Sequence, residues 1–462
     1  DETASASVLQ PLWSPTSGEL HFVSDASNGF WNIHCVAGSA SATPDASWAS
    51  RVVNVLPKEA DFSGAAPGWA FGSQGFTFLP DGRIVTAYSD REAGGSRLVV
   101  IDKQDGQDAG AVKEFSREDG LPYTFGGLTP VHDGSLLLLG AAPDTPWGIH
   151  RTDVLKGGTT VMLACSMKED SRIDPSYIST PAAISFATPD PASTGCAEAF
   201  GYFYSPRNAK YDAPANSLPP LLVKAHGGPT ACTGTSFNAG IQFWTSRGFA
   251  VLDVDYRGST GYGRKYRQAL RGNWGICDIE DVVAGAEHLV KQGLVDPRRL
   301  AIDGGSAGGY TTLGALAFKN TFTAGCSLYG VADLSALAGD THKFESRYLD
   351  SLVGRWPEDE AIYKERAPIH SAESLSCPVL LLQGSEDKIV PPNQAELMHK
   401  VLLEKGIPTA LKMYEGEQHG FRKAENIQDA LNSELYFYGK CWGFNPFFNP
   451  AGEGPAYTID NL

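Results

Sequence analysis

The chain has 462 residues, of which 42% are hydrophobic and 19% charged, a composition typical of soluble globular proteins with enough core for two domains. Its formal net charge of −16 at pH 7 repels phosphate groups, which excludes nucleic acids and anionic membranes as expected partners. No apolar run approaches the roughly 20 residues that a membrane span requires.

The eight cysteines are far apart in the sequence, form no C-x-x-C pair and have no histidine cluster beside them at zinc spacing. We therefore expect free, buried thiols and no metal site. The sequence has no N-x-S/T sequon, and it opens at Asp1 without a segment that resembles a signal peptide. Together these features predict a cytoplasmic location.

Residues 9–156 consist of short β-rich runs separated by turn residues. One theme recurs three times: a strand, a tight turn containing glycine and a second strand, followed in the later two copies by a polar loop and another strand. The predicted strands are Glu19–Val23 and Phe30–His34, then Gly75–Leu79, Arg83–Tyr88 and Arg97–Asp102, then Thr129–Val131, Ser135–Leu139 and Trp147–Arg151. The repeat length of about 50 to 60 residues lies near that of β-propeller blades.

Three blades do not close a ring, because propellers have ~4–8 blades and an open set leaves strand edges exposed. We therefore predict that residues 1–174 form a partial β-propeller whose remaining blades precede Asp1 or belong to another chain. A homo-oligomer, or association with a chain that supplies those blades, is expected on the same ground. A small β-sandwich is the alternative, but it explains the repeat less well.

From about residue 175 a join rich in Pro, Ser, Thr and Ala leads to alternating strand and helix signals. This alternation predicts an α/β domain over residues 175–462, with a mostly parallel sheet and helices on both faces. The expected strands are Leu221–Ala225, Phe249–Val254, Leu300–Asp303, Pro378–Gln383 and Ala410–Tyr414, and the expected helices are Gln242–Arg247, Asp281–Gln292, Tyr310–Phe318 and Gln394–Lys405. Each strand ends in a polar loop, where open α/β sheets place their chemistry.

The stretch Gly304–Gly308 has the pattern G-x-S-x-G and lies between an apolar strand and a helix pattern. In that context the motif predicts a nucleophile elbow, in which Ser306 occupies a tight turn that leaves no room for neighbouring side chains. Short motifs rich in Gly and Ser also recur by chance, so this interpretation depends on partners for the serine.

A hydrolytic serine needs a histidine to take its proton and an acid to orient that histidine, in the chain order Ser, Asp or Glu, His. Four histidines follow Ser306, and only His419 lies in a loop directly after a predicted strand. We interpret the other three as surface or structural residues: His342, His370 and His399. Asp387 follows the strand Pro378–Gln383 in the same way and is preferred to its neighbour Glu386.

The oxyanion of an acyl-transfer reaction needs hydrogen-bond donors, which we assign to two backbone positions. One is the amide of Ala307, directly after the serine. The other lies in the loop His226-Gly227-Gly228-Pro229, which follows the first predicted strand. Glycines in that loop allow amide groups to face a developing negative charge, although a plain Gly-Pro turn is the alternative.

Six motifs in this order resemble the prolyl oligopeptidase family of serine peptidases, closest to its acylaminoacyl-peptidase and dipeptidyl-aminopeptidase-like branch. The motifs are His226–Pro229, Asp255–Gly263, Trp274-Gly275 with Asp278 and Asp281, Gly304–Tyr310, the Asp387 loop and Gln418–Phe421. The resemblance covers Ser176 to Gly443. It implies an α/β-hydrolase fold preceded by a propeller that restricts the site to short peptides, and it implies no cofactor.

The resemblance also implies roles for single residues. Ser306 is expected to be the nucleophile, Asp387 the orienting acid and His419 the general base. The H-G-G-P loop has a histidine where some members of the family have a tyrosine, so an amide of Gly227 or Gly228 is the expected second oxyanion donor.

The segment Thr341–Leu349 resembles the one that lines the family's P1 pocket, with Phe344 and Tyr348 as aromatic walls. The alternative is that both are ordinary core aromatics. Arg257 and Asp281 are expected to form a structural ion pair rather than to take part in catalysis.

We thus predict a serine peptidase that cleaves short peptides through an acyl-enzyme on Ser306. A carboxylesterase-type hydrolase with the same triad and an inactive scaffold fragment are the alternatives. In dipeptidyl relatives, acidic residues of the propeller hold the substrate amine, and most of a propeller is absent here. The sequence therefore does not decide between an aminopeptidase, a dipeptidyl peptidase, an acylaminoacyl peptidase and an endopeptidase.

Overall fold

The structure is a computed structural model. It describes residues 6–39, 46–62, 74–90, 95–102, 111–154, 159–340, 343, 345–375, 377–448, 454–455 and 457–462. The chain divides into two compact units. The first comprises Asp1–Ala183, Gly234–Ala239 and Thr260–Arg267, and the second comprises Ile184–Thr233, Gly240–Ser259 and Gln268–Leu462.

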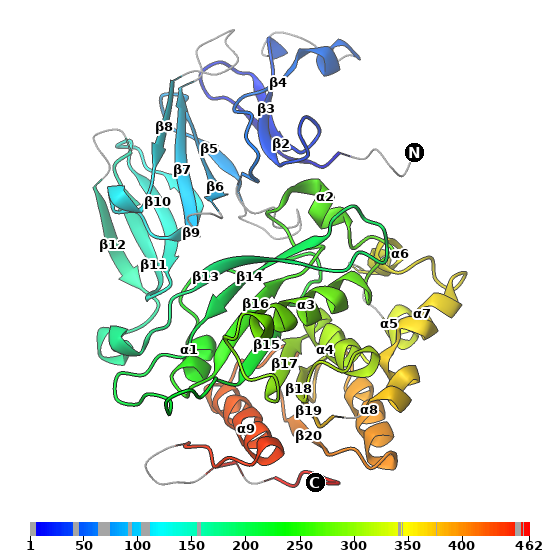
Figure 1. Cartoon of the computed structure of the whole chain (residues 1–462). Coiled ribbons are helices and arrows are strands. Elements are labelled where there is room, and N and C mark those ends of the chain that lie inside the picture. Colours follow the sequence, from blue (N-terminus) through cyan, green and yellow to red (C-terminus); the bar gives the residue numbers. More distant parts are fainter. Residues whose placement is uncertain are drawn as a thin grey trace. The chain divides into compact units, whose positions relative to one another are not determined.

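The first unit contains three antiparallel sheets of four strands each, in consecutive strand order (Figure 1). The strands of the first sheet are β1 (Val8–Trp13), β2 (Leu20–Ser24), β3 (Asn32–Val36) and β4 (Val52–Asn54), those of the second are β5 (Phe76–Phe78), β6 (Ile84–Asp90), β7 (Gly95–Asp102) and β8 (Ala111–Phe115), and those of the third are β9 (Thr124–Pro130), β10 (Leu136–Ala142), β11 (Thr145–Thr152) and β12 (Thr160–Cys165). Short 3-10 helices span Ala46–Arg51, Arg117–Asp119, Glu169–Ser171 and Pro175–Tyr177. The predicted blades are therefore confirmed, although each has more strands than the sequence indicated.

The second sheet is buried on both faces because its strands alternate between two hydrophobic clusters. Ile84 of β6 packs in a cluster with Ile33 of the first sheet, whereas the next residue, Val85, packs in a cluster with Leu136 of the third. Successive side chains of a strand point to opposite faces. An apolar strand such as β6 thus packs against both neighbouring sheets, one through each of its faces.

The second unit is built on an eight-stranded sheet in the order β13-β14-β16-β15-β17-β18-β19-β20. The strands are β13 (Ala182–Ala187), β14 (Glu198–Tyr204), β15 (Leu221–Ala225), β16 (Ala250–Asp255), β17 (Leu300–Gly305), β18 (Ala324–Leu328), β19 (Val379–Gly384) and β20 (Thr409–Tyr414). Strand β14 pairs antiparallel with β16, and every pair from β16 to β20 is parallel. This arrangement confirms the predicted α/β-hydrolase fold.

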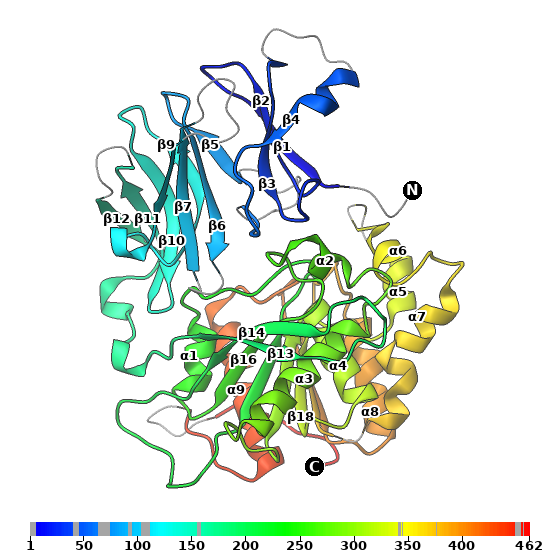
Figure 2. The same cartoon turned by 45° about the horizontal axis from the view of Figure 1, so that its top comes forward.

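Helices cover both faces of this sheet (Figure 2). Helices α3 (Cys277–Lys291), α4 (Ala307–Phe318) and α8 (Asn393–Glu404) share one hydrophobic core, and α1 (Ala239–Thr245) and α9 (Ala424–Trp442) share the other. The remaining helices are α2 (Gly263–Gln268), α5 (Leu334–Asp340), α6 (Tyr348–Leu352), α7 (Glu360–Arg366) and a 3-10 turn at Pro368–Ser374.

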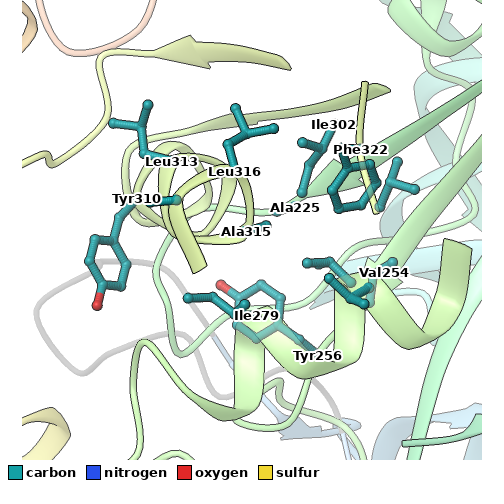
Figure 3. Close-up of a cluster of buried hydrophobic side chains, with 14 of the residues drawn as sticks. Ala225, Val254, Tyr256, Ile279, Ile302, Tyr310, Leu313, Ala315, Leu316 and Phe322 are labelled. Carbon is teal, nitrogen blue, oxygen red and sulfur yellow. The ribbon is translucent and has the colours of Figure 1, made fainter. Parts of the chain in front are cut away.

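The strand residues again alternate between the two cores. Leu221 and Val223 of β15 face the α4 side, and Leu222 between them faces the α9 side. Figure 3 shows part of the first of these cores, which includes Leu313 and Leu316 of α4 and Ile302 of β17. Helix α4 is apolar all round, which fits its place between the sheet and further helices.

The sequence interpretation missed several elements of the second unit, among them β13, β18, α5, α6, α7 and α9. Strand β18 has the sequence Ala-Gly-Cys-Ser-Leu, which has no β-branched residue and no alternation, and it becomes a strand because β17 and β19 pair with it on both sides. Strand β13 lies in what was interpreted as a join rich in Pro, Ser, Thr and Ala. Helix α3 begins at Cys277, four residues before the predicted start at Asp281.

The expectation that the eight cysteines are buried is wrong. Only Cys35, Cys277 and Cys326 are buried, and Cys232 is exposed. The described residues contain no group of three or more His, Cys, Asp and Glu side chains that could hold a metal ion. No described helix combines the length and the apolar character needed to cross a bilayer.

Candidate active site

Three residues from three strand ends of the second unit form one hydrogen-bonded chain. Nε2 of His419 lies 2.8 Å from Oγ of Ser306, and Nδ1 of His419 lies 2.8 Å from Oδ2 of Asp387. Since a carboxylate only accepts, the imidazole donates from Nδ1, which leaves Nε2 to accept the serine proton. The structure therefore brings together the three residues predicted as a triad, and it does not bring Glu386, the rival acid, to the histidine.

Ser306 lies on a strained turn between β17 and α4. Its φ of 58° and ψ of −121° are rare for a residue with a side chain. The turn is possible because the chain packs closely around it: a Cβ on Gly308 would overlap the carbonyl oxygen of Ala225 on β15, and a Cβ on Gly304 would overlap the backbone of Gly308. This geometry matches that of a nucleophile elbow, as the G-x-S-x-G pattern predicts.

The carboxylate of Asp387 is fixed by the loop that carries it. Its side chain is fully buried, and Oδ1 accepts hydrogen bonds from the amides of Ile389 at 2.9 Å and Val390 at 3.0 Å. These two bonds leave Oδ2 directed at His419. The acid is therefore held in one orientation before any substrate binds.

A buried glutamate holds the loop that carries His419. Glu417, two residues before the histidine, accepts hydrogen bonds from the amides of Arg422 and Lys423 and from the side chain of Asn426 on α9, at 2.8 to 3.0 Å. Burial alone would raise the pKa of Glu417, but these hydrogen bonds outweigh it and lower the pKa below its usual value. An ionised carboxylate just before His419 thus binds the backbone just after it and holds the loop in place.

Replacing Glu417 with Gln is expected to lower kcat several-fold and to leave KM nearly unchanged, because the variant amide presents N–H groups to backbone N–H donors and loosens the His419 loop. The carboxylate is ionised above its unfolded pKa, so its contribution to stability is present at neutral pH and is lost as the pH falls through the lowered folded pKa. The stability of the variant should therefore fall less than that of the wild type when the pH is lowered from neutral to acid.

Steady-state kinetics at pH 7 and melting curves between pH 3 and pH 7 measure both effects. Glu415→Gln is the matched control, since Glu415 is exposed in the same loop. An unchanged kcat in Glu417→Gln would contradict the role given to this carboxylate.

The H-G-G-P loop lies directly beside the serine. A Cβ on Gly227 would lie 3.6 Å from Cβ of Ser306, and Gly228 has a φ of 129°, which a residue with a side chain rarely adopts. His226 is stacked on Tyr256, with ring centroids 4.2 Å apart, and its Nε2 lies 2.7 Å from Oγ of Ser259. Burial lowers the pKa of His226, so the neutral imidazole is favoured.

Both predicted oxyanion positions are thus next to Ser306. Ala307 is the first residue of α4, and the first amides of a helix have no partner within the helix. Gly228 and Ala307 line one cavity together with the serine.

That cavity has a volume of about 220 Å³ and opens beside Ser306 and His419. Most of its described wall is apolar, formed by Val331, Leu337, Leu349, Ile389 and Val390 together with Trp274 and Pro229. Tyr348, predicted as a pocket wall, lines it. Its hydroxyl donates to Oγ1 of Thr230 at 2.7 Å, and burial raises its pKa. Phe344, the other predicted wall, lies outside the described residues.

Several residues of this site were not predicted. The ring of Tyr329 lies edge-on to His419, with centroids 5.0 Å apart, in the turn after β18. The sequence pattern did not point to Tyr329, because the strand β18 that precedes it was not predicted. Trp274 was noted only as part of a motif and Glu345 only as part of a segment, yet both line the cavity. The predicted ion pair is present: Arg257 lies 2.8 Å from Asp281, and both side chains are fully buried.

Comparison with known proteins points to one family. Residues 235–445 match the sequence profile of the prolyl oligopeptidase family. Over 251 residues the chain is 32% identical to dipeptidyl aminopeptidase BIII of Pseudoxanthomonas mexicana, covering 52% of this chain and 36% of that protein. Over 229 residues it is 30% identical to acylamino-acid-releasing enzyme 1 of Oryza sativa subsp. japonica, covering 47% of this chain and 30% of that protein.

A solved structure of a puromycin-hydrolyzing peptidase of Mycobacterium tuberculosis is 37% identical and superposes with a TM-score of 0.83. The match covers 96% of this chain and 62% of that one. The chain therefore spans less than two thirds of each of these three relatives. The matched residues 235–445 lie for the most part in the second unit and include Ser306, Asp387 and His419. Residues 235–445 are therefore similar in sequence to the prolyl oligopeptidase family.

Proposed function

We propose that the chain is a serine peptidase that cleaves short peptides through an acyl-enzyme on Ser306. The observation that carries this proposal is the hydrogen-bonded chain from Ser306 through His419 to Asp387, with both contacts at 2.8 Å, on a strained turn beside an apolar cavity. Such a chain activates an otherwise weak nucleophile. Two of the similar proteins are named as a dipeptidyl aminopeptidase and a puromycin-hydrolyzing peptidase, and these names favour an amide substrate.

In the proposed reaction, Oγ of Ser306 attacks the substrate carbonyl carbon while Nε2 of His419 takes the hydroxyl proton. Asp387 holds the imidazole and stabilises its positive charge. The amide of Ala307 and an amide of Gly227 or Gly228 donate to the oxyanion. His419 then gives its proton to the leaving amine as the C–N bond breaks. The same imidazole then deprotonates a water molecule, which attacks the carbonyl carbon of the acyl-enzyme ester. The bond between that carbon and Oγ of Ser306 breaks, the acid is released, and the imidazole returns the proton to Oγ.

A fluorophosphonate probe tests the nucleophile directly. We expect covalent labelling of the wild type at Ser306 and no labelling of Ser306→Ala, because only an activated serine attacks the probe at an appreciable rate. Ser217→Ala, which changes an exposed serine of the same unit, is the control and should label like the wild type. Equal labelling of wild type and Ser306→Ala would overturn the assignment.

The substrate class needs a second measurement. A short peptide p-nitroanilide and a p-nitrophenyl ester compare amide with ester hydrolysis at the same site. Turnover of the anilide supports the peptidase, whereas turnover of the ester alone would identify a carboxylesterase-type hydrolase. A folded protein that neither labels nor turns over either compound would be an inactive scaffold.

A further inference from the structure

Tyr329 holds its backbone in a conformation that bulky residues rarely adopt. Its φ is 40°, in the left-handed region, in the turn directly after β18. The turn is fixed by the amide of Tyr329, which donates to the carbonyl of Leu382 on β19 at 2.7 Å. A glycine or an asparagine would adopt this φ at a lower cost. Strained residues of this kind concentrate at active sites, so the contacts of this ring bear on the reaction.

The hydroxyl end of the Tyr329 ring packs against the turn that carries the serine. A Cβ on Gly305, the residue before Ser306, would lie 2.8 Å from Cε2, 2.9 Å from Oη and 3.0 Å from Cζ of Tyr329. Side chains do not approach so closely, so only a glycine fits against the ring. The amide of Ser306 also donates to the carbonyl of Leu328, directly before Tyr329, at 3.0 Å. The segment of Tyr329 therefore supports the serine turn through both backbone and side chain.

The same ring contacts the loop of the histidine. The centroid of the Tyr329 ring lies 5.0 Å from that of His419, with the planes at 63°, and 5.4 Å from that of Phe421, with the planes at 88°. Edge-on arrangements of this kind are favourable between aromatic rings. Phe421 in turn packs on Tyr414 at the end of β20, with centroids 4.5 Å apart. A Cβ on Gly420, between the two ring residues of the loop, would lie 4.0 Å from Oη of Tyr329.

Tyr329 packs mainly with these two loops. It is half-buried, whereas Tyr256 and Tyr310, which belong to the hydrophobic core of the unit, are fully buried. Burial raises the pKa of the Tyr329 hydroxyl, so the side chain stays neutral and adds no charge beside the imidazole. Tyr329 is also not among the described residues that line the cavity beside Ser306. Its effect is therefore expected on the geometry of the catalytic groups and not on the binding of substrate.

We propose that Tyr329 is a positioning residue whose ring separates the turn of Ser306 from the loop of His419 and fixes the distance between nucleophile and base. This inference rests on the proposed function and adds a residue to it. A displacement of about 1 Å between reacting groups can cost about 10²-fold in rate. The ring thus preserves the contact of 2.8 Å between Nε2 of His419 and Oγ of Ser306.

Tyr329→Asn tests the proposal, because asparagine tolerates a positive φ and removes the ring without adding backbone strain. We expect kcat for a short peptide p-nitroanilide to fall about 10- to 100-fold and KM to change less than about twofold. The rate of fluorophosphonate labelling at Ser306 should fall in the same proportion as kcat, since both need the activated serine. Tyr329→Phe keeps the ring and should restore nearly the wild-type kcat.

Melting curves show whether each variant is folded. Tyr329→Leu keeps an apolar side chain and the backbone strain of the wild type, so it replaces Tyr329→Asn if the latter does not fold, and the same fall in kcat is expected. Tyr211→Asn is the matched control, since Tyr211 is 77% exposed in the same unit, and it should retain the wild-type rate.

Three results would overturn the proposal: a folded Tyr329→Asn with nearly the wild-type kcat, a loss confined to KM, or an equal loss in Tyr329→Phe and Tyr329→Asn. The second result would assign Tyr329 to substrate binding, and the third would assign the effect to its hydroxyl. Failure of the proposed function looks different, because the wild type would then not turn over the anilide and would label no faster than Ser306→Ala.

Discussion

Replacing His419 with alanine is expected to lower kcat for a short peptide anilide by about 10⁴-fold or more, with a much smaller change in KM. Nε2 of His419 is the group that Ser306 contacts at 2.8 Å, so without it the serine proton has no acceptor within the site. The same group must protonate the leaving amine, and both halves of the reaction therefore fail together. Steady-state kinetics measure the loss, and a melting curve checks that the variant is folded.

His132→Ala is the control for this experiment, because His132 is exposed in the first unit. It should retain the wild-type rate. A His419→Ala variant that is folded and keeps more than a tenth of the wild-type kcat would show that another group takes the proton, and the proposed triad would have to be abandoned.

Replacing Arg257 with methionine is expected to destabilise the second unit by about 3–5 kcal/mol, the cost of leaving a buried charge without its partner. The guanidinium is fully buried and donates to Asp281 at 2.8 Å, to Asp190 at 3.0 Å and to the carbonyls of Pro189 and Cys196. Methionine keeps the volume of the aliphatic stem but removes every one of these donors. Denaturant unfolding followed by tryptophan fluorescence measures the loss.

The pH dependence of this loss has a definite sign. Burial raises the pKa of Asp281, and Arg257 opposes that effect. In the variant the pKa of Asp281 in the folded state should rise further, so that the protonated carboxyl becomes the stable form. The loss of stability relative to the wild type should therefore be smaller at pH 5 than at pH 8. Arg298→Met is the control: this arginine is 87% exposed in its pair with Asp296, and its loss should cost under about 1 kcal/mol. Equal effects of the two substitutions would contradict the structural role of Arg257.

The sequence could single out the three residues of the proposed triad because each follows a strand with a strong signal. The strands that precede Ser306, Asp387 and His419 are apolar runs bounded by polar loops, and parallel strands end at the same edge of a sheet. Chain order then suffices to bring the three together. The same reasoning predicted the blades, since a glycine turn between two apolar runs is a local signal.

The rest depends on contacts between segments that lie far apart in the sequence. Tyr329 approaches His419 only because β18 inserts between β17 and β19, and no local pattern in β18 announces a strand. Glu417 looks like one more polar loop residue until α9 supplies Asn426 to its carboxylate. The cavity is shared by residues from at least five separate elements and loops, so its shape follows from packing and not from any one motif.

The separation of the triad along the chain has a consequence for the order in which activity arises during synthesis. Ser306 and His419 are 113 residues apart, and the loop of His419 is closed by Asn426 at the start of α9. A ribosome makes the H-G-G-P loop and the turn of Ser306 well before it makes α9. In the nascent chain the turn of Ser306 can therefore form before His419 is held beside it, and the serine is then not activated. Under the proposed mechanism, hydrolysis would begin only once the loop of His419 is held by α9, so the onset of turnover during synthesis would report a folded α/β unit.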